Sequence, residues 1–287
     1  MPTTLRRTLN GHNHQLVVWD GPAGAPTVLL VHGYLDLAHS FERFARALQT
    51  RFPCRILAPD LRGHGRTEWV SPGGYYHFAD YVSDLYDLAQ SEGSPVHLIG
   101  HSMGGNISAL LAGAKPEIIR SLVLIEGLGP STHETLSPPE RMAEWFTGVR
   151  DVRSRVPRPL ASLEEAAARL LKNNPRLGSD EASRLAPHAT RVTTEGLFWA
   201  FDPRLRTRSP MPYTVDSFRT FLKAITAPAL FVEGSESQFH AYVADDRLED
   251  IRGVRAISID GAGHMVHQDR PDELADAVAA FLQQHHP

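Results

Sequence analysis

The 287-residue sequence has little cysteine, little lysine and no long apolar run. Cys54 is its one cysteine, so the chain cannot form an intramolecular disulfide and is not a disulfide-stapled extracellular scaffold. No stretch approaches the roughly 18 apolar residues that a membrane-spanning helix needs, and the N-terminal segment lacks the apolar stretch of a secretory signal. We therefore expect a soluble, cytoplasmic protein with no membrane partner.

Charge is nearly balanced over the whole chain but unevenly distributed along it. The 29 basic and 33 acidic side chains give a net charge of −4, which leaves no basic footprint for a nucleic-acid partner. The segment 131–225 carries 15 basic and 11 acidic side chains, hence +4, and the rest of the chain carries −8. This difference predicts that 131–225 is a separate structural unit. The sequence leaves the oligomeric state open, a homodimer included.

Short apolar or β-branched runs alternate with amphipathic segments along most of the chain. An unbroken apolar run such as TVLLV is typical of a strand buried on both faces, and strands that alternate with helices form parallel sheets. The pattern therefore predicts an α/β fold with a mostly parallel central sheet flanked by helices. The expected strands are 15–20, 27–31, 54–59, 96–99, 122–125, 229–232 and 256–259, and the expected helices are 40–48 (with Ser40 as N-cap), 81–91, 103–114 and 271–284.

The segment 131–225 interrupts this alternation. Ser137 and Glu140 have the spacing of a capping box, with Pro138 at the first helical position, and Ser162 with Glu165 repeats the spacing. A third helix is expected at 179–186 and a short extended stretch at 197–203. We interpret 1–130 and 226–287 as one core and 131–225 as an inserted, mainly helical cap.

The most specific motif is the G-x-S-x-G sequence that contains Ser102. It directly follows the strand expected at 96–99 and opens the helix expected at 103–114. A serine in this strand–turn–helix context is a nucleophile elbow, which presents the hydroxyl at the carboxyl end of a sheet.

Together with this elbow, three further segments resemble the α/β-hydrolase superfamily. His32-Gly33 resembles the family's oxyanion loop, the segment 60–67 (DLRGHGRT) its DxRGHGxS motif, and GAGH, ending at His264, its histidine loop. The segments VHGYLDLAHSF, YYHFADYVSDL and LVLIEGLGP resemble the serine-hydrolase-like (kraken-type) branch. The resemblance implies an α/β-hydrolase fold and a hydrolase that needs no cofactor.

A serine hydroxyl is a weak nucleophile, so a base must accept its proton. Histidine titrates in the right range, and His264 lies in a glycine-rich loop after the strand expected at 256–259. Such a loop can reach the sheet edge where Ser102 lies. His267 is the alternative nearest in sequence, and the GAGH spacing favours His264.

The acid that orients this histidine departs from the commonest family pattern. The position after the strand at 229–232 where the acid usually stands is occupied by Ser237, which carries no charge. Glu126, at the end of the strand expected at 122–125, and Glu236 are the two candidates to replace it. We favour Glu126, because a buried carboxylate at a strand end needs a partner and His264 would supply one.

Stabilisation of the oxyanion is expected from two backbone N–H groups. Met103 stands at the N-terminus of the elbow helix, and Tyr34 follows His32-Gly33. Substrate contacts are expected from apolar side chains of the insertion and of the loop after His264. These candidates are Trp145, Phe146, Trp199 and Met265, with Phe201 and Met211 as further possibilities.

The leading hypothesis is a serine hydrolase that cleaves a carboxylic ester or related small-molecule acyl substrate through an acyl-enzyme. A C–C bond hydrolase or an acyltransferase would use the same triad, and a non-catalytic ligand-binding protein on this fold is the third alternative. We expect neither a metal nor another cofactor, because the paired histidines near the two ends of the chain lack a carboxylate cluster.

Overall fold

The computed structural model describes residues 2–130, 136–211, 213–238 and 246–286, which include an eight-stranded sheet. Its strand order is β1-β2-β4-β3-β5-β6-β9-β10. The strands from β4 to β10 in this order run parallel, while β1 and β2 form an antiparallel edge. The strands are β1 (Thr3–Leu9), β2 (His12–Trp19), β3 (Thr27–Val31), β4 (Arg55–Pro59), β5 (Val96–His101), β6 (Ile119–Ile125), β9 (Ala229–Gly234) and β10 (Arg255–Ile259).

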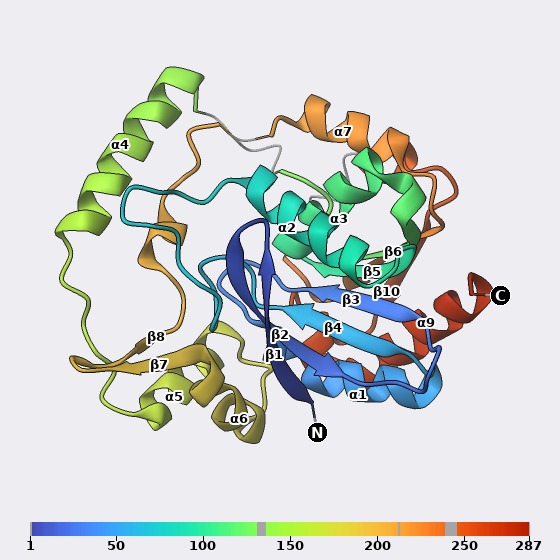
Figure 1. Ribbon diagram of the computed structural model, residues 1–287, viewed down its shortest axis with the longest axis horizontal. Coiled ribbons are helices and arrows are strands. Elements are labelled where there is room, and N and C mark those ends of the chain that lie inside the picture. The colour runs from blue at the N-terminus through green and yellow to red at the C-terminus, as the bar shows by residue number, and fades with distance from the viewer. Residues whose placement is uncertain (1, 131–135, 212, 239–245, 287) are drawn as a thin grey trace.

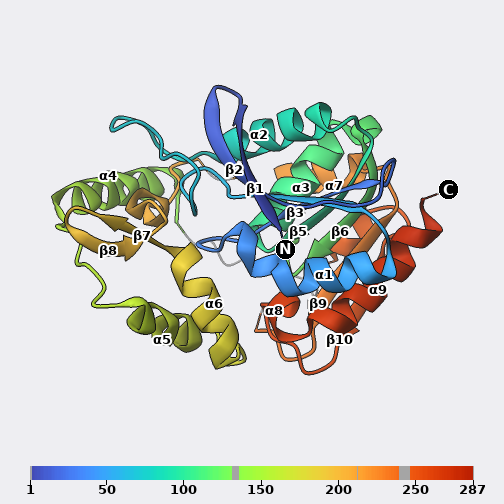
Figure 2. The same ribbon diagram turned by 60° about the horizontal axis from the view of Figure 1, so that its bottom comes forward.

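Helices cover both faces of this sheet, as predicted for a mostly parallel α/β architecture (Figure 1, Figure 2). Helices α1 and α9 pack against each other on one face, and α2, α3 and α7 pack on the other. They are α1 (Glu42–Arg51), α2 (Phe78–Ser91), α3 (Met103–Ala114), α7 (Val215–Ala224) and α9 (Pro271–Gln284), with the short α8 (Val266–Asp269) before α9.

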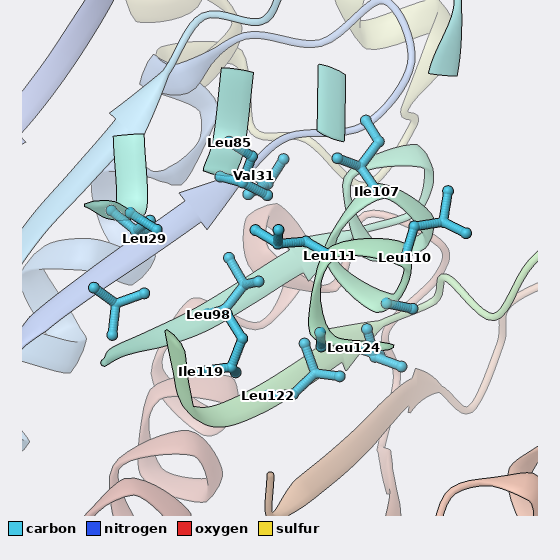
Figure 3. Close-up of a cluster of buried hydrophobic side chains, with 14 of the residues drawn as sticks. Leu29, Val31, Leu85, Leu98, Ile107, Leu110, Leu111, Ile119, Leu122 and Leu124 are labelled. Carbon is cyan, nitrogen blue, oxygen red and sulfur yellow. The ribbon is translucent and has the colours of Figure 1, made fainter. Parts of the chain in front are cut away.

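The apolar run in β3 shows why the sheet needs helices on both faces. Leu29 and Val31 point into the cluster under α2 and α3, which Figure 3 shows. Val28 and Leu30 point into the opposite cluster, which includes Phe44 of α1. Successive side chains of a strand point to opposite faces, so an unbroken apolar run is buried on both.

Residues 138–206 form a separate group of elements, here called the α4–η3 segment, at one end of the sheet. The arrowheads of β3 and β4, which mark the carboxyl ends of these strands, point toward it (Figure 1). Its own buried cluster is small and includes Leu160 and Leu185. The segment consists of α4 (Pro138–Ser154), α5 (Leu163–Asn173), α6 (Ser179–Ala189), the hairpin β7 (Thr190–Thr193) and β8 (Gly196–Trp199), and the 3-10 turn η3 (Pro203–Arg206).

The predicted helix starts in this segment are confirmed. Ser137 and Glu140 form the capping box before α4, and the Ser162 hydroxyl accepts a hydrogen bond from the backbone N–H of Glu165. Helix α7 also falls within 131–225, yet its Phe218 belongs to the buried cluster of the sheet. Residues 131–135 of the expected insertion lie outside the described residues.

Three local features differ from the sequence-based expectations. Strand β1 was not expected, because its residues are mostly polar and it is an edge strand that pairs only with β2. Helix α7 was not expected either, although Phe218, Phe221 and Leu222 recur at helical spacing. Ser40 was expected as the N-cap of the first helix, but that helix begins at Glu42. The Ser40 hydroxyl instead donates to Asp36 at 2.8 Å.

In the ranges that the structure describes, no helix combines the length and apolar character needed to cross a bilayer.

Candidate active site

Ser102 occupies the sharp turn between β5 and α3. Its backbone has φ +51° and ψ −116°, a conformation that costs a non-glycine residue about 1–3 kcal/mol and is held by the surrounding structure. The Ser102 N–H donates to the carbonyl of Ile125 at 2.8 Å, which ties the turn to the end of β6. Gly104 permits the turn, because a Cβ there would lie 2.1 Å from the carbonyl oxygen of Val31. The elbow predicted from the motif is therefore present.

His264 and Glu126 meet at the same edge of the sheet. His264 lies in the loop after β10, and its Nδ1 is 3.2 Å from Oε2 of Glu126, the residue that follows β6. The His264 side chain is 23 % exposed and that of Glu126 only 3 %. A carboxylate in this position fixes which ring nitrogen carries the proton, because Nδ1 must then be the donor.

The environment of Glu126 is built to hold a buried carboxylate. Its Oε1 accepts a hydrogen bond of 2.7 Å from the backbone N–H of Gly234, and its Oε2 accepts one of 2.6 Å from the Ser237 hydroxyl. With His264, three donors therefore converge on this carboxylate. Hydrogen bonds to the charged form offset the cost of removing it from water.

Glu236, the other candidate acid, lies in a different environment. Its side chain is 55 % exposed and forms an ion pair with Arg176. Glu236 is thus directed to the surface while its neighbour Ser237 is buried and bonded to Glu126. Of the two candidates, the structure brings Glu126 to His264.

Buried polar side chains contact the loop that carries His264. The Nε2 of His101, the residue before Ser102, lies 2.8 Å from the carbonyl oxygen of His264. Burial holds the pKa of His101 well below its usual value, so the ring is neutral and the nitrogen facing a carbonyl must be its N–H donor. His267, the weaker candidate for the base, is fully buried and faces Asp36 and Ser40 instead.

Among the described residues, one group of metal-binding side chain types comes together. Asp36, His101 and His267 offer ligand atoms within 4.8 Å of one another. The Oδ2 of Asp36 already accepts the Ser40 hydroxyl and faces His267 at 3.5 Å. Although burial opposes ionisation of Asp36, its hydrogen bond with His267 lowers its pKa below the ordinary value. His101 contacts this pair through its ring, with 4.5 Å between the ring centroids of His101 and His267, and Nδ1 of each of these two histidines has no hydrogen-bond partner among the described residues.

The two segments that carry the backbone N–H groups expected to stabilise an oxyanion lie beside Ser102. Met103 is the first residue of α3, where backbone N–H groups have no acceptor within the helix. The loop before Tyr34 is fixed by His32, whose Nε2 accepts the N–H of Leu61 at 3.0 Å. A Cβ at Gly33 would lie 3.2 Å from Cβ of Ser102, so this loop passes directly beside the Ser102 side chain.

A cavity of about 610 Å³ adjoins this site, between the sheet and the α4–η3 segment. Tyr34, Trp199 and Met265 line it, as does Phe201. These residues surround the cavity next to the elbow and the histidine loop.

The other apolar candidates are placed differently. Neither Trp145 nor Phe146 lines the cavity: Trp145 packs edge-on against Tyr75 with ring centroids 5.0 Å apart, and Phe146 is 57 % exposed. Both lie on α4, whose long helical surface faces solvent over most of its length. Met211 is 81 % exposed. Two adjacent aromatic residues on a helix predict that at least one of them packs against a neighbouring element. The sequence alone does not identify that element.

Sequence reasoning missed two kinds of contributor to this region. Ser237 was regarded only as an uncharged residue at the usual acid position, whereas its hydroxyl donates to the carboxylate of Glu126. The hydroxyl of Ser237 was the available signal, because a hydroxyl can donate a hydrogen bond to a buried carboxylate. The positive charge of the insertion was interpreted as a solvated surface, and Arg169, Lys172 and Arg206, which line the cavity, were not singled out, because no local pattern distinguishes them from other exposed cations.

Comparison with known proteins supports the fold and the branch. The model of the alpha/beta hydrolase family matches residues 28–277. A serine hydrolase-like protein of Danio rerio is 24 % identical, with 94 % of this chain and 85 % of the relative aligned. A 3-hydroxybutyrate-oligomer hydrolase of Cupriavidus necator is 30 % identical over 92 % of this chain and 90 % of the relative. The crystal structure of the hypothetical protein PA1622 from Pseudomonas aeruginosa superposes with a TM-score of 0.86 at 29 % identity, covering 98 % of this chain and 99 % of that one. The chain belongs to the α/β hydrolase family and is a hydrolase of its serine-hydrolase-like branch.

Proposed function

We propose that this protein is a serine hydrolase that cleaves a carboxylic ester or related acyl substrate through an acyl-enzyme. Ser102 is the nucleophile, His264 the general base and Glu126 the residue that orients His264. The observation that carries the proposal is the pairing of His264 Nδ1 with Glu126 Oε2 at the sheet edge where the strained elbow holds Ser102. A hydroxyl, an imidazole and a buried carboxylate in this order form the acyl-transfer triad.

The proposed reaction follows from which ring nitrogen remains available. Because Nδ1 of His264 faces Glu126, Nε2 is the nitrogen left to accept the proton of the Ser102 hydroxyl. The Ser102 oxygen then attacks the carbonyl carbon, and the N–H groups of Met103 and Tyr34 stabilise the resulting oxyanion. Collapse of the intermediate breaks the ester bond, and His264 returns its proton to the departing alcohol.

The second half of the reaction repeats these steps with water. His264 accepts a proton from the water that attacks the acyl-Ser102 ester, and then returns it to Ser102 as the carboxylic acid leaves. No external oxidant or metal takes part in this scheme. The name of the 3-hydroxybutyrate-oligomer hydrolase, which is 30 % identical, agrees with an ester substrate.

The buried polar contacts also argue against a non-catalytic role. That alternative depended on the absence of a charge at residue 237. Here Ser237 donates to Glu126, so the site retains a carboxylate next to His264.

The first test measures hydrolysis of p-nitrophenyl butyrate by the wild-type protein and by Ser102→Ala. We expect kcat to fall by at least about 10⁴-fold in the variant, because the remaining triad members act only through the missing nucleophile. Ser154→Ala, which removes a hydroxyl on α4, is the matched control and should leave kcat unchanged. Equal release of butyrate and p-nitrophenol would identify water as the acceptor and exclude acyl transfer. A wild-type protein inactive on esters, thioesters and lactones, or an active Ser102→Ala, would contradict the proposal.

A further inference from the structure

The cavity next to the active site has a positively charged lining. Arg169 and Lys172 of α5 and Arg206 of η3 line it. Among the described residues that line the cavity, Asp36 is the only acid, and its carboxylate is already held by Ser40 and His267. The cavity therefore presents an excess of positive charge to whatever enters it.

Two of these three cations have no acid partner within the part of the chain that the structure describes. Arg169 forms an ion pair with Glu165, one helical turn before it. Neither Lys172 nor Arg206 forms an ion pair with a described residue, so their charges are not neutralised within the protein. An unpaired charge beside a cavity favours a ligand of opposite sign.

Arg206 is held in a way that suits ligand binding. Its guanidinium lies over the ring of Phe201, with 5.1 Å between the guanidinium carbon and the ring centroid. Stacking on an aromatic face restrains the planar group and leaves its N–H donors free in the plane, where they match the two oxygens of a carboxylate. Arg206 is exposed, and this contact leaves its side chain less freedom to lose on binding than an unrestrained exposed arginine has.

Arg206 also lies near the side chain of Tyr34, the residue whose backbone N–H is expected to stabilise the oxyanion. The hydroxyl of Tyr34 donates to the carbonyl of Leu205, the residue before Arg206, at 3.3 Å. Burial raises the pKa of Tyr34, and the nearby Arg206 charge opposes that rise. The cavity thus extends from the loop beside Ser102 to this guanidinium.

The rest of the lining is mainly apolar. Such a wall favours a hydrocarbon chain between the reacting carbonyl and a charged end, since burying that chain contributes about 0.8 kcal/mol per methylene. The apolar lining residues include Leu37, Leu170, Leu177, Leu185, Ala189, Trp199 and Met265.

We infer that the physiological substrate is an ester whose acyl chain ends in a carboxylate, and that Arg206, assisted by Lys172, binds this carboxylate in the cavity. The inference rests on the proposed function and specifies its substrate class. If the basic residues only form a solvated surface, the enzyme will not distinguish an acyl chain with a terminal carboxylate from one without.

The test compares matched pairs of p-nitrophenyl esters. Each pair has the same number of acyl carbons, such as the hexanoate and the adipate monoester, and the series runs from five to eight carbons. We expect the wild-type protein to have a higher kcat/KM for the dicarboxylate monoester in at least one pair. The preference should decrease about tenfold in Arg206→Met and further in the double variant with Lys172→Met, because charge-assisted hydrogen bonds are lost. Hydrolysis of the neutral ester should stay within about twofold.

Controls separate this inference from the proposed function. Arg150→Met removes an exposed positive charge on α4 that does not line the cavity, and it should leave the preference unchanged. Raising NaCl to 0.5 M should reduce the wild-type preference by screening. If neutral esters are cleaved in a Ser102-dependent way but no pair shows a preference that Arg206→Met lowers, the inference alone is wrong. If the wild-type protein cleaves neither member of any pair, the proposed function fails and this inference with it.

Discussion

The ends of strands β6 and β9 lie side by side in the sheet, and they contribute to the site in different ways. At the end of β6, Glu126 places a carboxylate against His264. At the end of β9, Gly234 and Ser237 provide hydrogen-bond donors to that carboxylate, and Glu236 turns to the surface. The carboxylate that faces His264 thus stands one strand nearer to Ser102 than the loop after β9, and that loop supplies hydrogen-bond donors to it.

The difference between the two glutamates follows from their surroundings. A carboxylate as buried as Glu126 is tolerated only where donors satisfy both oxygens, and the β9 loop supplies them. Glu236 remains in solvent and pairs with Arg176. Exposed ion pairs contribute about 0–1 kcal/mol to stability, so substitution of Glu236 should change the stability of the protein little. Because their surroundings differ, we expect substitution of these two glutamates to have very different effects.

Removing the carboxylate at the end of β6 should have the largest effect. We expect Glu126→Ala to lower kcat for p-nitrophenyl butyrate by about 10³–10⁴-fold, because His264 loses the partner that fixes its tautomer. Glu126→Gln preserves the size of the side chain while removing its charge and turning one of its two acceptor atoms into a donor. Retention of more than a tenth of the wild-type kcat in both variants would show that another group orients His264.

Returning an acid to the β9 loop would sharpen the comparison. The double variant Glu126→Ala with Ser237→Asp places a carboxylate at the position from which Ser237 now reaches the same region. We expect it to recover at least tenfold of the kcat lost in Glu126→Ala. Ser237→Asn in the same background is the uncharged control and should recover nothing.

Removing the supporting hydroxyl should have an intermediate effect. Ser237→Ala leaves Glu126 with Gly234 and His264 as donors but deletes one hydrogen bond to a charged group, worth about 1.5–3 kcal/mol. We expect kcat to fall by about tenfold and the melting temperature to drop by several degrees. Activity and melting curves that match those of the wild-type protein would show that this hydroxyl does not support the acid.

Substitution of the exposed acid, Glu236, should have the smallest effect on kcat. Glu236→Ala is expected to change kcat by less than about twofold, since its partner Arg176 is itself 40 % exposed. A loss greater than tenfold, measured with the same ester, would reverse the assignment of the two strand ends.

The sequence was most informative about elements that depend on a local residue pattern. The run at 27–31, the helix at 103–114 and the elbow around Ser102 all follow from hydrophobic periodicity and from glycines that allow close approach. The edge strand β1 could not be predicted in this way, because its residues are mostly polar and show no buried face. Helix α7 was overlooked, although Phe218, Phe221 and Leu222 recur at helical spacing after the N-cap Thr214.

The site itself was predictable only in part, because its contacts join segments that lie far apart in the sequence. Burial and charge favoured Glu126 over Glu236, but the hydrogen bond from Ser237 is visible only once β6 and β9 are neighbours. Likewise, nothing near Arg206 in the sequence indicates that η3 brings it to a cavity beside Tyr34. Contacts between segments more than 100 residues apart leave no periodic signal.

The central claim is that Ser102 is an activated nucleophile, and covalent labelling tests it most directly. The wild-type protein is treated with a fluorophosphonate, and the modified peptide is located by mass spectrometry, with Ser102→Ala and Glu126→Ala treated in parallel. The account predicts one equivalent of label on Ser102, none in Ser102→Ala and much slower labelling in Glu126→Ala. A folded wild-type protein that remains unlabelled, or that carries the label on another residue, would contradict it.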